Sequence, residues 1–138
     1  MSFNQGFMTT ELLAAALLDM ELHNLTDTDN LNVVAFEKET MDKLGLIPEI
    51  APRYRATYFS HIIGGYAAGY YSYLWAEVLD TDAFEAFKEH GVFDKNTADS
   101  FRKNILEKGG TEDPMTLYRG FRGADPSLEP LLKNRGLK

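Results

Sequence analysis

A histidine and three tyrosines follow one another closely in the middle of the chain, and their polar groups could act together. The three tyrosines, Tyr66, Tyr70 and Tyr73, have the spacing i, i+4 and i+7. On a helix, at roughly 100° per residue, this spacing places them within about 60° of one another on one face. His61 precedes them on the other side of a pair of glycines. The pattern is typical of a polar wall along one side of a cleft.

A row of aromatic residues at helical spacing is also the ordinary pattern of a buried core. Each buried tyrosine hydroxyl needs a hydrogen-bond partner, however, and Phe or Leu would fill a core without that requirement. Gly64 and Gly65 directly precede the tyrosines and would let a backbone or a substrate approach closely. The residues alone leave both interpretations open, a core stripe and the wall of a functional cleft. Tyr71 lies off the shared face in either case.

Composition and charge exclude several classes of protein and of site. The chain has 138 residues and no cysteine, which rules out disulfides, thiolate metal sites and thiol nucleophiles and suits a reducing compartment. Its net charge of −7, with no basic stripe, argues against a nucleic-acid partner. The apolar run Leu12–Leu18 is too short for a membrane span and lacks the basic flank of a signal peptide. We therefore expect a soluble, cytoplasmic protein.

The three histidines do not form a metal site by their spacing. His23, His61 and His90 include no His-Glu-x-x-His motif and no pair at helical ligand spacing. His23 and His90 fall at predicted helix ends, where a partly cationic side chain suits the helix dipole. Ser60 stands beside His61, too close in sequence to form an aligned catalytic dyad. The sequence therefore predicts no metal ligands in this chain and no self-contained nucleophile.

Helical periodicity runs through the whole chain, and no segment alternates in the manner of a strand. The stripe Leu13, Leu17 and Met20 predicts a helix over 9–23, and an Asn32 cap starts a second helix that ends before Gly45. Later helix boundaries are predicted at Asp82 with Glu85, Gly91, Asp94, Gly109-Gly110, Thr111, Asp125-Pro126 and Gly136 with Leu137. The predicted fold is all-α, a single compact domain over 1–138 with seven or eight helices.

The segment His61–Trp75, with its pattern His-x-x-Gly-Gly-Tyr-x-x-x-Tyr-Tyr-x-Tyr-Leu-Trp, resembles the substrate-binding segment of zinc peptidases of the thimet-oligopeptidase and dipeptidyl-carboxypeptidase type. The stretch Tyr66–Tyr70 looks closer to the dipeptidyl-carboxypeptidase branch. Three further segments resemble the same family, so the likeness spans nearly the whole chain: Phe3–Phe7 with Thr10-Glu11, Gly109–Asp113 and Arg135–Leu137.

The resemblance implies roles for the residues of this segment. It assigns His61, Tyr66 and Tyr73 as catalytic donors that stabilise the negative charge growing on the peptide carbonyl oxygen. Tyr70, with Gly64 and Gly65, is expected to bind substrate; tyrosine suits such a site because it donates one hydrogen bond and stays neutral at pH 7. Zinc in this family sits on a helix bearing His-Glu-x-x-His, which this chain lacks. Zinc is therefore expected only in a full-length parent enzyme, and this chain alone is expected to be inactive.

The resemblance further implies that the chain is the C-terminal portion of a larger helical metallopeptidase, a peptidyl-dipeptidase that releases C-terminal dipeptides. Its expected partners are an oligopeptide substrate and the missing N-terminal catalytic portion. An alternative is a stand-alone helical interaction module that keeps the fold without catalysis. In either case a chain separated from its surroundings exposes apolar surface, and we expect self-association into a homo-oligomer through the first helix, at Leu12, Leu13, Leu17 and Leu18.

Overall fold

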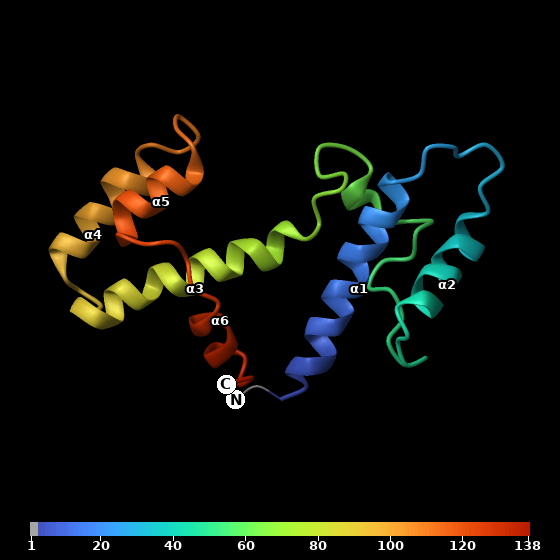
Figure 1. The fold of residues 1–138 in the computed structure, drawn as a ribbon, viewed down its shortest axis with the longest axis horizontal. Helices are drawn as coiled ribbons and strands as arrows, with labels where there is room; N and C mark the ends of the chain where they lie inside the picture. The colour runs from blue at the N-terminus through green and yellow to red at the C-terminus, as the bar shows by residue number, and fades with distance from the viewer. Residues whose placement is uncertain (1–2) are drawn as a thin grey trace. The chain divides into compact units, whose positions relative to one another are not determined.

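The computed structural model describes residues 3–138, and this part of the chain is helical (Figure 1). It contains six α-helices, one 3-10 helix and one π-helical segment, and no strand among the described residues. This confirms the all-α class, with slightly fewer helices than expected. No described helix is long and apolar enough to cross a membrane. Where the sequence suggested one compact domain, the contacts divide the chain into two compact units, Met1–Tyr73 and Leu74–Lys138.

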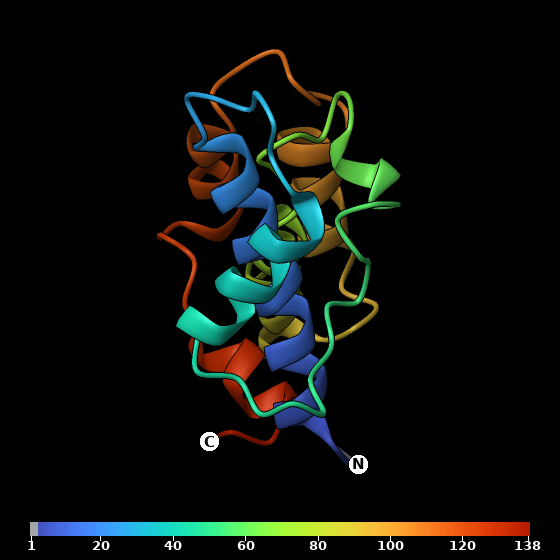
Figure 2. The same cartoon turned by 90° about the vertical axis from the view of Figure 1, so that its right-hand side faces the viewer.

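The first unit is built on two α-helices and a long irregular segment. Helix α1 spans Gln5–His23 and α2 spans Val33–Lys43, and a 3-10 helix follows at Ser60–Ile62. The predicted Asn32 cap is confirmed, because its side chain accepts a hydrogen bond of 3.1 Å from the backbone N–H of Ala35. Both views place α2 beside α1 (Figure 1; Figure 2). These elements carry the segment that holds the predicted site.

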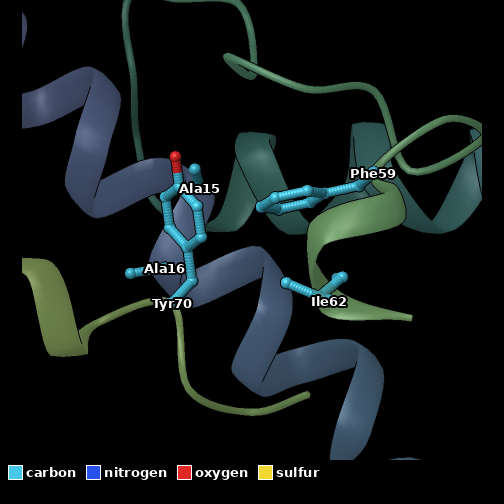
Figure 3. Packing of buried hydrophobic residues seen from close by; sticks show 5 residues of the cluster. All are labelled: Ala15, Ala16, Phe59, Ile62 and Tyr70. Carbon is cyan, nitrogen blue, oxygen red and sulfur yellow. The ribbon is translucent and has the colours of Figure 1, made fainter. Parts of the chain in front are cut away.

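The core of this unit lies against the alanine-rich face of α1. Ala15 and Ala16 are buried there, and their small side chains let large residues approach the helix closely. Phe59, Ile62 and Tyr70 fill that space, with the Tyr70 ring standing over the two alanines (Figure 3). The Phe59 and Tyr70 rings meet edge to face, with their centroids 5.0 Å apart. This packing anchors the predicted site segment to α1 at Ile62 and at Tyr70.

Another face of α1 is exposed. The stripe Leu13, Leu17 and Met20, at helical spacing, leaves between 41% and 44% of each side chain accessible. The prediction of an exposed apolar surface on this helix is thus correct for Leu13 and Leu17. It is wrong for Leu18, which is fully buried, and Leu12 is only partly exposed because it packs against the core of Ala15 and Ala16.

The second unit consists of four α-helices and one π-helical segment. Its elements are α3 Ser72–His90 (its first two residues in the first unit), α4 Lys95–Phe101, the π-helical segment Arg102–Leu106, α5 Pro114–Arg122 and α6 Glu129–Asn134 (Figure 1). Aromatic rings join three of the helices. The ring centroid of Phe101 on α4 lies 6.0 Å from that of Phe87 on α3 and 5.1 Å from that of Phe121 on α5.

The predicted capping box at Asp82 and Glu85 is wrong, because both residues lie inside α3. The Asp82 side chain is buried, and its carboxylate accepts a hydrogen bond of 2.6 Å from the hydroxyl of Tyr118 on α5. Burial and this neighbouring carboxylate both raise the pKa of Tyr118 above its ordinary value. Asp82 therefore serves to join two helices and does not begin one.

Two other predicted helix starts are displaced by a few residues. Helix α5 is capped by Asp113 and not by Thr111, since the Asp113 carboxylate accepts a 2.9 Å hydrogen bond from the N–H of Thr116. Helix α6 begins at Glu129, so Pro126 precedes the helix instead of opening it. Helix α1 also begins earlier than predicted, at Gln5 and not at residue 9. The Asp94 cap of α4 is confirmed, as is the left-handed turn just after the end of α6.

Candidate functional site

The predicted site residues occupy a series of turns, not one helix. Tyr66 and Tyr70 lie between the 3-10 helix and α3, and only Tyr73 belongs to an α-helix. The prediction of one shared helical face is therefore wrong. The backbone explains why, since Gly64 has φ +153° and Ala68 has φ +52°. Neither value fits a continuous right-handed helix.

The side chains nevertheless converge, because the turns bring all three rings onto His61. The Tyr66 ring stacks on the imidazole, with centroids 5.2 Å apart and 25° between the planes. Tyr70 meets the imidazole edge-on at 5.3 Å, and Tyr73 lies tilted at 5.7 Å. Tyr71 takes no part in this cluster among the described residues. We call His61, Tyr66, Tyr70 and Tyr73 the His61 cluster.

The members of the His61 cluster differ sharply in accessibility. Tyr66 and Tyr73 are 65% and 50% exposed, whereas Tyr70 is only 4% exposed. The Tyr73 hydroxyl lies 3.2 Å from Nε2 of His61, which is hydrogen-bond distance. Two accessible phenols and an imidazole thus form an open group of hydrogen-bond donors. Beneath them, Tyr70 joins the cluster to the core.

Tyr70 has the packing of a core residue with a polar tip. Its ring also faces Tyr54 at a centroid distance of 6.4 Å. Its hydroxyl interacts with the guanidinium of Arg53, and this hydrogen bond raises the pKa of Arg53 above its ordinary value. No buried side-chain polar atom among the described residues lacks a partner. Tyr70 thus supports the His61 cluster from the side of the core. Its expected role in lining a substrate channel stays a prediction.

The glycines of the segment fall into two kinds. A Cβ built on Gly64 or Gly65 would meet open space in this chain, which is consistent with room for a substrate. A Cβ on Gly69 would lie 3.0 Å from the carbonyl oxygen of Tyr66. The close backbone approach that a glycine permits thus occurs at Gly69, a position that the sequence interpretation did not select. The Gly69 N–H donates to that same Tyr66 carbonyl at 3.0 Å.

The structure also shows a site residue that sequence reasoning missed. Asp19 of α1 is fully buried, and its carboxylate oxygens accept hydrogen bonds from the backbone N–H groups of Ala68 and Tyr70, both at 2.9 Å. Nδ1 of His23 lies 2.8 Å from one of the same oxygens. The available signal was an acidic residue at the end of an apolar helix face, four positions before a histidine. Burying such a residue without hydrogen-bond partners costs a large free energy.

Replacing Gly69 with alanine is expected to lower the free energy of unfolding by about 1–3 kcal/mol, because the added Cβ must displace backbone atoms of Tyr66. Gly65→Ala is the matched control: it adds the same atom in open space, and we expect a change within about 0.5 kcal/mol. Denaturant unfolding followed by circular dichroism measures both variants. Equal stability of the two would show that the tight turn does not need this glycine.

Zinc, which the resemblance implies for the parent enzyme, finds no ligand set here. Over residues 3–138 no three side chains of His, Cys, Asp or Glu come together as metal ligands. Nδ1 of His23 is turned to Asp19, and Nδ1 of His90 lies 2.9 Å from the Ala86 carbonyl oxygen. His61 contacts aromatic rings. The described residues therefore do not fit a zinc centre, and the groups they supply are hydrogen-bond donors.

Comparison with known proteins shows the family of this chain. The family model described as Peptidase family M3 matches residues 1–137. The chain, which is helical over its described residues, therefore belongs to peptidase family M3. The resemblance seen in the segment His61–Trp75 is confirmed.

Both kinds of relative suggested by that resemblance occur among the similar proteins. The dipeptidyl carboxypeptidase of Escherichia coli (strain K12) is 45% identical over 142 residues, which cover 98% of this chain and 20% of that protein. The oligopeptidase A of the same strain is 57% identical over 81 residues, covering 58% of this chain and 12% of that protein. A probable cytosolic oligopeptidase A of Arabidopsis thaliana is 40% identical over 99% of this chain. The chain spans about a fifth of the length of such relatives.

Proposed function

We propose that this chain is the substrate-binding portion of a zinc-dependent oligopeptidase, and that the complete enzyme is a peptidyl-dipeptidase releasing C-terminal dipeptides. The observation that carries the proposal is the His61 cluster, in which accessible phenol groups of Tyr66 and Tyr73 stand beside an imidazole. Membership of peptidase family M3 and the dipeptidyl carboxypeptidase relative support the reaction class.

The chemistry of peptide hydrolysis gives these donors a task. When the scissile carbonyl carbon becomes tetrahedral, negative charge grows on its oxygen, and well-placed hydrogen-bond donors stabilise that charge. The Tyr73 hydroxyl and His61 Nε2 are 3.2 Å apart, so a single oxygen atom can reach both. Tyr66, stacked on the imidazole, holds its plane and offers a further hydroxyl. The described residues thus supply the charge-stabilising side of the site and no metal ligands.

The remaining four-fifths of the enzyme is the proposed partner of this chain. The exposed stripe Leu13, Leu17 and Met20 supports this, since an apolar helix face of this kind is normally covered by protein. In the isolated chain the same stripe would be free to pair with a second copy. The chain alone, without metal ligands, is proposed to be inactive.

The complete peptidase should cleave an oligopeptide with a free C-terminal carboxylate at least about tenfold faster than the same peptide with an amidated C-terminus. An enzyme that measures two residues from the end must bind the terminal carboxylate, and a hydrogen bond to a charged group contributes about 1.5–3 kcal/mol. Mass spectrometry of the products identifies the released dipeptide. A peptide acetylated at its N-terminus is the control and should be cleaved normally.

Equal cleavage of the two peptides at an internal bond would contradict the dipeptidase mode and assign the enzyme to the endopeptidase kind. Loss of all cleavage, in a zinc-loaded enzyme with intact fold, would contradict the peptidase proposal itself. The two outcomes are separated by following several peptide lengths in the same assay.

A further inference from the structure

The buried carboxylate of Asp19 has two backbone partners in one turn and a third neighbour, His23, on its own helix. One oxygen accepts from the N–H of Ala68 and lies 2.8 Å from Nδ1 of His23, and the other accepts from the N–H of Tyr70. Nδ1 of His23 also lies 2.8 Å from the backbone carbonyl oxygen of Asp19. Two backbone N–H donors and a histidine nitrogen therefore surround a side chain that is 0% exposed.

The turn held by Asp19 has a conformation that its residues do not favour by themselves. Ala68 adopts φ +52°, in the left-handed region that side chains with a Cβ seldom occupy. Such conformations persist where surrounding contacts over-determine them, and they gather at functional sites. The hydrogen bonds to Asp19 fall on Ala68 itself and on Tyr70 two residues later. They act directly on the unfavourable residue.

The same turn sets the positions of the His61 cluster. It connects Tyr66, which stacks on His61, to Tyr70, whose ring supports both His61 and Tyr73. We propose that Asp19 is a positioning residue of the peptidase site, which fixes the turn from Tyr66 to Tyr70 so that the phenol groups surround His61. The expected effect of Asp19 on catalysis rests on the proposed function. That Asp19 holds the turn rests on the geometry of its hydrogen bonds alone.

Asp19→Asn tests the clamp with almost no change in size. The asparagine amide keeps one oxygen acceptor, but its NH₂ group replaces the second carboxylate oxygen and faces the donors of that oxygen. At least one backbone N–H therefore loses its partner. In the complete zinc-loaded peptidase we expect hydrogen exchange of residues 66–70 to become about 10–100-fold faster. We expect kcat to fall on the order of 10²-fold with KM within threefold, because small misplacement of catalytic groups has effects of this size.

Asp82→Asn is the matched control. Asp82 is also a buried helical carboxylate that accepts hydrogen bonds, but its partners are Tyr118 and Arg122 in the second unit. A general loss of stability would appear in both variants, whereas altered exchange at residues 66–70 and reduced kcat should appear only in Asp19→Asn. Equal reduction of kcat in the two variants would overturn the positioning role.

Two results separate this inference from the proposed function. If Asp19→Asn leaves kcat unchanged while Tyr66→Phe and Tyr73→Phe lower it, the positioning role is wrong and the catalytic proposal stands. If the tyrosine variants are all active, the catalytic proposal fails, and the exchange measurement alone then decides whether Asp19 clamps the turn. Unchanged exchange at residues 66–70 in Asp19→Asn overturns the clamp in every case.

The unmodified enzyme supplies an independent measurement if Asp19→Asn does not fold. Hydrogen exchange at single-residue resolution should show the amides of Ala68 and Tyr70 protected about tenfold or more relative to those of Gly65 and Tyr71. Neither of the latter two amides donates a backbone hydrogen bond in the described part of the chain. Similar rates at all four amides would overturn the inference without any substitution.

Discussion

Replacing Tyr66 or Tyr73 with phenylalanine in the complete, zinc-loaded peptidase is expected to lower kcat about 10²–10³-fold, with little change in KM. Phenylalanine keeps the ring and its contacts with His61 and removes only the hydroxyl donor. A donor that acts on developing charge matters more in the transition state than in the bound substrate, so its loss appears in kcat. Steady-state kinetics on one oligopeptide measures both constants.

Tyr71→Phe is the internal control for this prediction. Tyr71 is 52% exposed, close to the value for Tyr73, but its ring is outside the His61 cluster. Tyr71→Phe should therefore leave kcat nearly unchanged. If the cluster were only packing, the Tyr66 and Tyr73 variants would instead show a stability change of about 1 kcal/mol and normal turnover. Full kcat in both would remove the catalytic assignment. His61→Ala is expected to reduce turnover as well.

Replacing Phe59 with alanine is expected to lower the free energy of unfolding by about 3–5 kcal/mol, the largest stability effect that we predict for this chain. Phe59 is 1% exposed, and its ring stacks on Tyr54 at 5.1 Å and meets Tyr70 at 5.0 Å. The cavity left by the ring lies beside Tyr70, which belongs to the His61 cluster (Figure 3). Denaturant unfolding followed by circular dichroism measures the change.

Phe93→Ala removes the same side chain from a position that is 99% exposed, and it should change stability by less than about 0.5 kcal/mol. A similar loss in the two variants would mean that the cluster of Phe59, Ile62 and Tyr70 is not the core of the first unit. Phe59→Ala should also disturb the tyrosines, since Tyr70 loses one of its two ring supports on that side.

Short-range signals in the sequence determined much of the fold. Asn32 and Asp94 cap helices because each side chain reaches a backbone N–H only three residues away. The end of α6 is set in the same way: Gly136 turns with φ +67°, and the N–H of Leu137 donates to the Leu132 carbonyl at 2.9 Å. The choice of His61, Tyr66 and Tyr73 as one group came from the family resemblance of a single short segment.

Only the tertiary structure decided how that segment folds. The spacing of Tyr66, Tyr70 and Tyr73 predicts a helix, in which the N–H of Tyr70 would donate to the Tyr66 carbonyl. In the structure this N–H and that of Ala68 donate to Asp19, which is 51 and 49 residues away along the chain. A buried carboxylate is a stronger acceptor than a backbone carbonyl, and it must be satisfied once it is buried.

The misassigned Asp82 has the same physical explanation. Its position three residues before Glu85 is a valid local capping signal, but its actual donor is Tyr118, 36 residues later. A local pattern reports hydrogen bonds that close within one turn of helix. It carries no information on which distant donor will meet a buried carboxylate, because that depends on how the helices pack. Asp19 and Asp82 therefore became recognisable as structural centres only when the chain was folded.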